Sequence, residues 1–368
     1  MKDDAYMSRA VALAKNGIGH VNPNPLVGAV IVKDDRIIGE GWHERYGGLH
    51  AERNAFKNCV EEAEGATLYV TLEPCCHYGK TPPCTEAIIE HKIARVVIGI
   101  LDPNPLMSGK SVELLRTHGI EVEVGILEKE CLALTRIFRK YITTKKPYVL
   151  AKYAMTMDGK IATHTGASKW ITGEAARRSV QETRKEFSAI MAGIRTVLCD
   201  DPMLNCRIEK GCDPVRVICD THLQIPLTSK IVQSAKTIQT IIACGSSYDT
   251  AKKAALEAQH CEILELPGET GMVDLAALMS ALGERGIDSV LIEGGGSLNW
   301  SAFSERLVDA VQAYIAPKIF GGTAASPVSG TGVDLPEQAV QLVNSTIRQI
   351  GEDYLIESEV KYPCLQES

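Results

Sequence analysis

Three cysteines, a histidine and three prolines lie within fourteen residues in the stretch TLEPCCHYGKTPPC, residues 71–84. Upstream, the segment GLHAERNAF places His50 and Glu52 two residues apart at the start of a predicted helix. One histidine and two cysteines, here His50, Cys75 and Cys84, supply three ligands for tetrahedral zinc and leave a fourth position for water. This number of ligands is typical of a catalytic zinc site, because a structural site is closed by a fourth protein ligand.

Glu52 is not expected to be a zinc ligand. From the first helical turn its carboxylate can face the water, take its proton and deliver that proton to the substrate and to the leaving amine. The order H-x-E, then P-C, then a further cysteine is the signature of zinc deaminases. This chain departs from the usual C-x-x-C spacing, because eight residues separate Cys75 from Cys84.

Other interpretations of the cysteines stay open at this point. A disulfide between Cys75 and Cys84 would need an oxidising compartment. A closed structural zinc site would need His77 or Cys76 as its fourth ligand, and Cys76 could replace Cys75 as a ligand, although the Pro-Cys pair favours Cys75. Small core side chains or free thiols are expected for the dispersed cysteines: Cys59, Cys131, Cys199, Cys206, Cys212, Cys219, Cys244, Cys261 and Cys364.

A second chemical pattern lies near the end of the chain, in SVLIEGGGSLNW at residues 289–300. An apolar strand runs there into three glycines and the start of a helix. Bare glycine backbone lets a phosphate approach the helix N–H groups. The pattern is not the G-x-G-x-x-G fingerprint, and a plain tight turn is an equally good interpretation of the glycines by themselves.

Length and composition predict a protein of two domains. The chain has 368 residues, of which 45% are hydrophobic. A chain of this length usually folds around more than one hydrophobic core. The polar, proline-containing segment TTKKPY at 143–148 marks the expected boundary, with domains at 1–145 and 146–368. Strands and helices alternate in both halves, which predicts α/β domains with sheets covered on both faces.

The apolar periodicity predicts the individual elements. In the first half, helices are expected at 5–15, 50–62, 83–91, 111–118 and 127–139, and strands at 27–32, 36–39, 67–72, 95–100 and 122–124. In the second half, strands are expected at 148–154, 189–192, 215–219, 240–243, 262–266, 289–292 and 311–315, and helices at 174–187, 249–259 and 274–285.

Charge and hydropathy argue against several classes of protein. The formal net charge is −7, and no lysine/arginine block exceeds a pair, which disfavours a nucleic-acid partner. No apolar run reaches the roughly 18 residues of a membrane span. The N-terminal sequence MKDDAYMSRA has no apolar signal region, so a cytoplasmic protein that binds no membrane is expected.

The motifs resemble a known family. HVNPNPLVGAVIV at 20–32, HAE at 50–52, TLEPCCHYGKTPPC and DPNP at 102–105 are similar to the deaminase half of the bifunctional deaminase/reductases of riboflavin biosynthesis. The long insert before the second cysteine distinguishes this group from cytidine and tRNA adenosine deaminases. YVLAKYAMTMDGKIA at 148–162, SKWITG at 168–173 and GIRTVLCDDPMLNCR at 193–207 resemble the reductase half.

The resemblance implies the fold and the reactions. It implies an α/β protein, with an N-terminal cytidine-deaminase-like αβα sandwich followed by a dihydrofolate-reductase-like α/β domain. It also implies hydrolytic deamination of the small phosphorylated substrate 2,5-diamino-6-(5-phosphoribosylamino)pyrimidin-4(3H)-one with Zn2+. Reduction of the ribosyl group by NADPH would then give 5-amino-6-(5-phosphoribitylamino)uracil, in a homo-oligomer assembled through the reductase domain.

The resemblance also implies site residues. Independently of the resemblance, Lys152 in the first predicted strand of the second half is our candidate for stabilising the ring-opened carbonyl or imine, and a surface lysine on an edge strand is the alternative. Deaminase substrate contacts fall on Asn24, His43, His77, Lys80 and Asn104, and reductase substrate contacts on Ser168, Arg184, Leu204, Arg207 and Glu293. NADPH contacts fall on Ala154, Trp170, Thr196, Asp200, Gly295, Gly296, Ser297, Leu298, Asn299, Trp300 and Ser301.

Two other functions are compatible with parts of the sequence. A zinc deaminase of nucleic acids with a C-terminal binding module would share the first motif, although the acidic balance disfavours it. A second domain that acts only as a scaffold or nucleotide sensor would share the glycine-rich turn.

Overall fold

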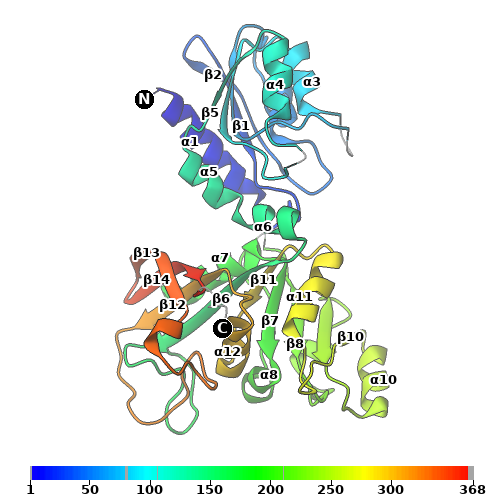
Figure 1. Cartoon of the computed structure of the whole chain (residues 1–368), viewed down its shortest axis with the longest axis vertical. Helices are drawn as coiled ribbons and strands as arrows, with labels where there is room; N and C mark the ends of the chain where they lie inside the picture. Colours follow the sequence, from blue (N-terminus) through cyan, green and yellow to red (C-terminus); the bar gives the residue numbers. More distant parts are fainter. Residues whose placement is uncertain (1, 79–81, 106, 210, 364–368) are drawn as a thin grey trace. The chain divides into compact units, whose positions relative to one another are not determined.

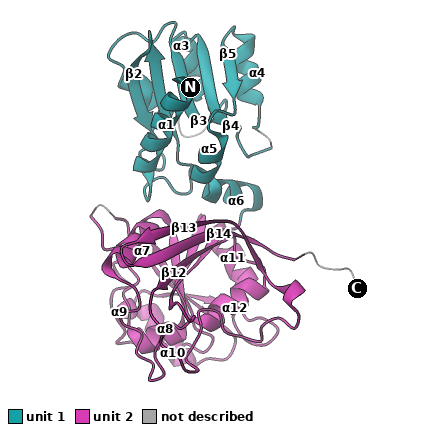
Figure 2. Ribbon diagram, turned by 90° about the vertical axis from the view of Figure 1, so that its left-hand side faces the viewer, with its two compact units in different colours: residues 1–145 teal, residues 146–368 magenta. Residues whose placement is uncertain are grey.

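The computed structural model describes residues 2–78, 82–105, 107–209 and 211–363. The chain divides into two compact units, Met1–Lys145 and Lys146–Ser368, and this division falls within the segment TTKKPY (Figure 2). The expected helices and strands occur in both units, with changes at several boundaries.

The first unit is a five-stranded sheet between two layers of helices (Figure 1). The strand order is β2-β1-β3-β4-β5, with β1 antiparallel to both its neighbours and the last three strands parallel. The strands are β1 (Gly28–Lys33), β2 (Arg36–Trp42), β3 (Thr67–Leu72), β4 (Arg95–Ile100) and β5 (Glu121–Val124). Buried aliphatic side chains of these strands form one continuous core with the helices.

Helices cover both faces of this sheet. On one face lie α1 (Lys2–Ala14), followed by the short helix η1 (Lys15–Gly17), and α5 (Glu128–Leu134). On the other face lie α2 (Ala51–Lys57), α3 (Cys84–Glu90) and α4 (Lys110–Thr117). The unit ends with α6 (Arg136–Thr144).

Two predicted helices of the first unit differ from the structure. The helix expected at 50–62 ends at Lys57, because the chain then turns and the Val60 N–H bonds the Ile38 carbonyl beside β2. The helix expected at 127–139 is divided at Thr135 into α5 and α6. The Thr135 hydroxyl donates to the Cys131 carbonyl, a local bond of the kind that competes with helical geometry.

The second unit is a nine-stranded sheet in the order β10-β9-β8-β7-β11-β6-β12-β14-β13. The first seven strands in that order are mutually parallel, and the last two are added antiparallel. The strands are β6 (Tyr148–Thr156), β7 (Ala189–Gly193), β8 (Val215–Cys219), β9 (Thr240–Cys244), β10 (Glu262–Glu265), β11 (Ser289–Ile292), β12 (Ala310–Ala316), β13 (Gln341–Ile350) and β14 (Asp353–Lys361).

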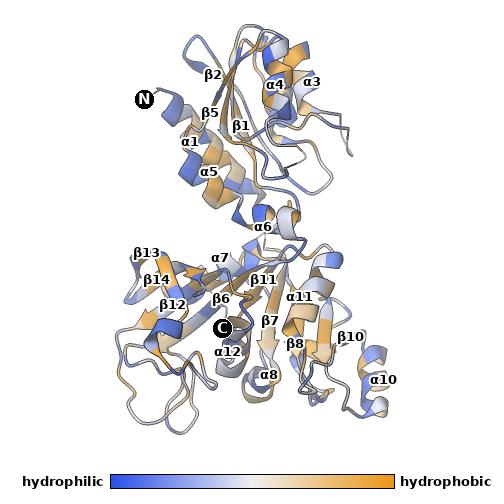
Figure 3. Ribbon diagram, in the orientation of Figure 1, coloured by the Kyte–Doolittle hydropathy of each residue, from blue (hydrophilic) through white to orange (hydrophobic). Residues whose placement is uncertain are grey.

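Helices pack against this sheet through apolar side chains. Figure 3 shows the apolar character of β7, β8 and α11, which supply much of the buried core. The helices are α7 (Glu174–Glu186), α8 (Ile194–Asp200), α9 (Lys230–Gln233), α10 (Thr250–Ala258), α11 (Leu275–Glu284) and α12 (Gly296–Ser304), with a short turn of helix η2 (Pro336–Gln338).

The hairpin β13–β14 was not among the predicted elements. Most residues of β13 are exposed, so this strand carries no alternation of apolar and polar side chains that periodicity could detect. The strand is recognised only by its long antiparallel pairing with β14.

Candidate active sites

His50, Cys75 and Cys84 meet at one point of the first unit. His50 and Cys84 stand at the N-terminal ends of α2 and α3, and Cys75 follows β3 after a short turn. Their ligand atoms all lie within 4.8 Å of one another. The His50 Nδ1 atom is 3.4 Å from each of the two Sγ atoms.

The spacing of these atoms fits zinc. Bond lengths of about 2.3 Å to sulfur and about 2.0–2.1 Å to nitrogen, at tetrahedral angles, separate the two ligand atoms by about 3.6 Å. Among the described residues the group has three members, so neither Cys76 nor His77 closes it. The three thiol and imidazole donors therefore suit a catalytic zinc ion with one open position.

The surroundings favour a metal-binding thiolate. The neighbouring Cys84 thiol and the His50 imidazole lower the pKa of Cys75 to about 4, although burial opposes this shift. The Cys84 N–H also donates to the Cys75 Sγ at 3.3 Å, from the first turn of α3. A helix N-terminus stabilises negative charge at such a sulfur.

Glu52 lies on the first turn of α2, two residues after His50, and is 3% exposed. Burial raises the pKa of its carboxyl group. A carboxyl group that is removed from water and close to the metal ligands is suited to exchange protons near neutral pH. Glu52 is not a member of the three-ligand group.

Asn24 and His43 form a hydrogen-bonded pair in the same unit. The His43 Nδ1 atom is 2.9 Å from the Leu49 carbonyl, and Nε2 is 3.1 Å from the Asn24 amide nitrogen. Because a carbonyl only accepts, Nδ1 carries the proton. Burial lowers the pKa of His43, so the ring is neutral and Nε2 accepts from Asn24. Asn24 therefore directs its amide nitrogen to His43 and keeps its amide oxygen for another donor.

The DPNP segment follows β4 and borders the metal-binding group. The Asn104 N–H donates to the Asp102 carboxylate, which shapes the turn. Burial raises the pKa of Asp102. The Asp102 N–H donates to the carboxylate of Glu73, two residues before Cys75, which joins this turn to the segment that carries the ligand. Lys80, the remaining predicted contact, lies outside the described residues.

In the second unit, the predicted residues gather where neighbouring parallel strands end. β11 lies between β7 and β6, so Glu293 after β11 and Thr196 after β7 come to one edge with the last residues of β6. Open parallel sheets bind ligands at this edge. The Thr196 hydroxyl lies close to Gly294 and Gly295.

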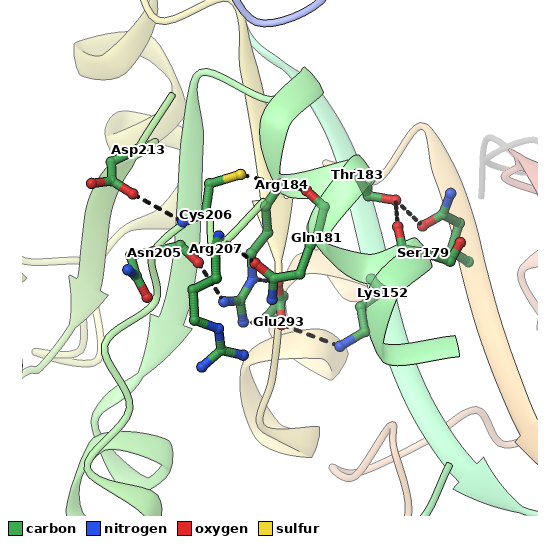
Figure 4. A network of polar contacts seen from close by, with 11 residues as sticks. Lys152, Ser179, Gln181, Thr183, Arg184, Asn205, Cys206, Arg207, Asp213 and Glu293 are labelled. Atoms are coloured by element: carbon green, nitrogen blue, oxygen red, sulfur yellow. Dashed lines mark hydrogen bonds and ion pairs between the residues drawn. The ribbon is translucent and has the colours of Figure 1, made fainter. Parts of the chain in front are cut away.

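Lys152, Arg184 and Glu293 form a buried cluster of charges (Figure 4). The Arg184 guanidinium donates to both Glu293 oxygens, at 2.6 and 3.0 Å, and the Lys152 ammonium donates to Oε2 at 3.2 Å. Burial alone would raise the pKa of Glu293, but the two cations outweigh it and lower that pKa to about 2. Lys152 lies on an inner strand between β11 and β12, with its side chain 13% exposed.

A hollow of about 560 Å³ lies between α7 and the segment at residues 207–209. Arg207 lines it, and its backbone N–H donates to the buried Gln181 side chain. Trp170, 63% exposed, lies under the Arg177 guanidinium at 4.5 Å. Leu204 is buried in the same core cluster as Ile190 and Val197.

Other predicted residues of the second unit lie close to this region. The Ser168 hydroxyl donates to Asp200 at 3.4 Å, which joins the segment before α7 to the end of α8. The Ala154 methyl group packs with Ala176 and Tyr314. A cofactor would therefore meet Ala154 mainly through its backbone.

The three glycines lead into α12, which begins at the third of them, Gly296. A Cβ on Gly296 would lie 2.6 Å from the Ser329 hydroxyl and 2.7 Å from the Ser326 carbonyl, so the close packing requires glycine here. Leu298 and Asn299 are buried and anchor the helix. The Trp300 ring packs against Gly330. Gly295, Ser297 and Ser301 are partly or wholly exposed.

Sequence reasoning missed some residues that shape these sites. Gln181 holds the backbone at Arg207, and Arg177 stacks on Trp170. Arg177, Gln181 and Arg184 follow one another at intervals of four and three residues, so they lie on one face of α7. This spacing is the sequence signal that could have identified Arg177 and Gln181.

The fold and the three-ligand group define a zinc-binding deaminase domain joined to a reductase domain. Residues 1–100 match the family model of the cytidine and deoxycytidylate deaminase zinc-binding region, and residues 147–356 match that of the RibD C-terminal domain. The chain is 52% identical to riboflavin biosynthesis protein RibD of Actinobacillus pleuropneumoniae, across 99% of this chain and 96% of that protein. It is 37% identical to RibD of Escherichia coli, across 96% and 98% of the two chains.

Solved structures agree with this match. A deaminase/reductase from Thermotoga maritima, described as diaminohydroxyphosphoribosylaminopyrimidine deaminase/5-amino-6-(5-phosphoribosylamino)uracil reductase, aligns with a TM-score of 0.84 at 41% identity, over 99% of both chains. RibD of Acinetobacter baumannii aligns with a TM-score of 0.85 at 38% identity, over 98% of this chain and 99% of that one.

The chain belongs to the RibD family of bifunctional deaminase/reductases of riboflavin biosynthesis. The predicted resemblance and fold class are thereby confirmed. The alternative of a nucleic-acid deaminase with an unrelated binding module is wrong, since the second half is a reductase domain of this family. No helix in the described part of the chain is long and apolar enough to cross a membrane.

Proposed function

We propose that the first unit deaminates 2,5-diamino-6-(5-phosphoribosylamino)pyrimidin-4(3H)-one and that the second reduces the product with NADPH. The observation that carries the proposal is the three-ligand group of His50, Cys75 and Cys84 with Glu52 beside it, in a chain that also contains the reductase unit. The final product is 5-amino-6-(5-phosphoribitylamino)uracil. The sequence identity of 41% to the Thermotoga maritima enzyme over 99% of the chain supports the choice of substrate.

In the first unit, His50, Cys75 and Cys84 hold zinc. Zinc, when bound, lowers the pKa of water and supplies a nucleophile at neutral pH. Glu52 accepts a proton at its carboxylate and returns it to the amine that leaves as ammonia. Burial raises the pKa of Glu52, which suits a group that must take up and release a proton in each cycle.

The pyrimidine ring is held by side chains that border this group. Asn24 offers its amide oxygen to a ring N–H or amino group, because His43 occupies its amide nitrogen. Asn104 and His77 contact the ring from the other side, and Lys80 takes part at the phosphate. These residues come from different loops of the unit, so binding depends on the positions of those loops.

In the second unit, NADPH binds at the strand edge formed by β6, β7 and β11. NADPH, when bound, supplies the hydride. The Gly295–Ser301 segment receives a phosphate at the N-terminus of α12. Thr196, Trp170, Asp200 and the backbone of Ala154 complete the cofactor site.

Lys152 acts on the ring-opened ribose. Its ammonium donates a hydrogen bond to the carbonyl or imine at C1′ and supplies a proton as that carbon is reduced. Glu293 orients the ammonium at 3.2 Å, and Arg184 in turn fixes Glu293 through two hydrogen bonds. The ribose phosphate lies toward Arg207 and the hollow beside α7. Ser168 and Leu204 complete the substrate site.

The chain also assembles with a second copy through the reductase unit. β13 is the last strand of the nine-stranded sheet and leaves one side of its backbone unpaired, with Leu342 and Ile347 exposed. Such an edge is suited to pairing with another chain. The cytoplasm is the compartment in which the zinc-binding thiols stay reduced.

Two single-step assays and two variants test the proposal. Mass spectrometry would follow deamination of the diaminopyrimidinone without NADPH, and reduction of the deaminated compound with NADPH. Glu52→Gln should abolish only the first step, and Lys152→Met should abolish only the second. Each variant therefore serves as the control for the other, because it keeps the step that the other variant loses. Failure of zinc-loaded wild-type protein in the first assay would refute the deaminase substrate, and failure in the second would refute the reductase assignment.

A further inference from the structure

Glu73 joins β3 to the metal-binding turn and has an unusual set of partners. Its side chain is buried, in a residue that is 5% exposed. The carboxylate accepts hydrogen bonds from three backbone N–H groups, those of Asp102, Gly109 and Ser111, at 2.9–3.0 Å. No lysine or arginine in the described part of the chain forms an ion pair with Glu73.

The three N–H groups belong to the two ends of one loop. This loop follows β4, contains the DPNP turn and ends at α4, which begins at Lys110. Gly109 precedes the helix with a φ of 81° and has no side chain that could cap it. Glu73, directly after β3, therefore supplies the acceptor that the first turn of α4 lacks.

The same loop is connected to the metal-binding turn at a second point. The Ser111 hydroxyl donates to the carbonyl of Pro74, the residue directly before Cys75, at 2.5 Å. The Glu73 N–H donates to the Ile100 carbonyl at the end of β4. Hydrogen bonds thus connect the loop that carries Asn104 to the segment that carries Cys75, and Glu73 forms most of these bonds.

We propose that Glu73 is a positioning residue for deamination, which holds the 101–111 loop so that Asn104 meets the pyrimidine ring beside the metal site. The inference rests on the proposed function of the first unit. Glu73 takes no part in proton transfer, since its oxygens are occupied by backbone donors. Its removal should therefore weaken substrate binding more than it slows the chemical step.

Glu73→Gln tests this role. The amide keeps the size of the side chain, but its NH2 group cannot accept, so at least one backbone N–H loses its partner. The KM of deamination should rise about tenfold, within the range for a lost hydrogen bond to a charged acceptor, while kcat changes less. Zinc content, measured by mass spectrometry, and reduction of the deaminated compound should match wild type.

A double-mutant cycle with Asn104→Ala separates positioning from general support of the fold. If Glu73 acts through Asn104, Glu73→Gln should raise KM little further in the Asn104→Ala protein. Asp220→Asn is the matched control, because Asp220 is a buried carboxylate that accepts from the backbone of Gln224 and Ile225 in the other unit. This control should leave the deamination KM unchanged.

The possible outcomes separate the role of Glu73 from the proposed deamination itself. An unchanged KM in Glu73→Gln, or effects of the two substitutions that simply add, would overturn the role of Glu73 while deamination by the wild type still stands. Absence of deamination in the zinc-loaded wild type would instead overturn the proposed function. If Glu73→Gln loses zinc or does not fold, Glu73→Asp, which keeps the charge on a shorter side chain, undergoes the same measurements.

Discussion

Glu293→Gln is expected to lower the free energy of unfolding of the second unit by about 3 kcal/mol at pH 7. Among the described residues, Glu293 is the acidic partner of both cations of the buried cluster. Its side chain is 6% exposed, against 10% for Arg184 and 13% for Lys152. Glutamine keeps the shape but removes the charge that compensates both cations. Breaking a buried pair on one side typically costs about 3–5 kcal/mol.

The magnitude also follows from the pKa of Glu293. Lys152 and Arg184 overcome the effect of burial and lower this pKa from 4.5 to about 2. At 1.36 kcal/mol for each unit, this difference amounts to about 3 kcal/mol of stability. Because the folded pKa lies below the unfolded one, the contribution is complete above about pH 4.5 and is lost as the pH falls toward 2. The cost of Glu293→Gln should therefore shrink by about 1.4 kcal/mol between pH 7 and pH 3.5.

Urea unfolding measures this effect, with the fluorescence of Trp170 and Trp300 reporting on the second unit. Glu262→Gln is the matched control, because its partner Arg285 forms an exposed ion pair that should contribute less than about 1 kcal/mol. A loss below about 1 kcal/mol in Glu293→Gln at pH 7 would show that water screens the cluster. A loss that does not change with pH would show that the charge of Glu293 is not its cause.

Three further results are expected. Gly296→Ala should weaken NADPH binding about tenfold, measured by calorimetry, because its Cβ would collide with the Ser329 hydroxyl and displace the turn; unchanged affinity would remove the turn from the cofactor site. Arg216→Met should lower the melting temperature and cost about 2–4 kcal/mol of stability, because the buried guanidinium donates to the carbonyls of Ile231 and Ile238. Lys252→Met, at a partly exposed position, serves as control. Leu342→Lys with Ile347→Lys should shift the chain toward the monomer in light scattering, and an unaltered mass would exclude β13 as the contact.

The zinc site could be predicted from the sequence because its chemistry depends on residue types at short spacing. His50 and Glu52 are neighbours on one turn of helix, and the Pro-Cys pair identifies Cys75. Strands at 67–72, 95–100, 215–219 and 289–292 occur within the predicted bounds, since continuous apolar runs are typical of strands buried on both faces. The exposed strand β13 has no such pattern and was missed.

The reductase cluster could not be predicted from spacing, because its members are far apart in the chain. Glu293 is 141 residues from Lys152 and 109 from Arg184. Their contact depends on β11 lying between β7 and β6, an order that no local periodicity encodes. The alternative of a surface lysine on an edge strand is wrong for Lys152, because β6 lies between β11 and β12.

The sequence by itself determined the three metal-binding residues, the two-unit organisation and the family, because residue type and local period can be read directly from the chain. Only the tertiary structure decided which side chains hold those groups in place. Glu73 shows the difference: its carboxylate acts on backbone N–H groups of a loop 29–38 residues away, and those groups carry no side-chain signal. A backbone donor has the same chemistry at almost every position, so only the fold can reveal which ones a buried carboxylate binds.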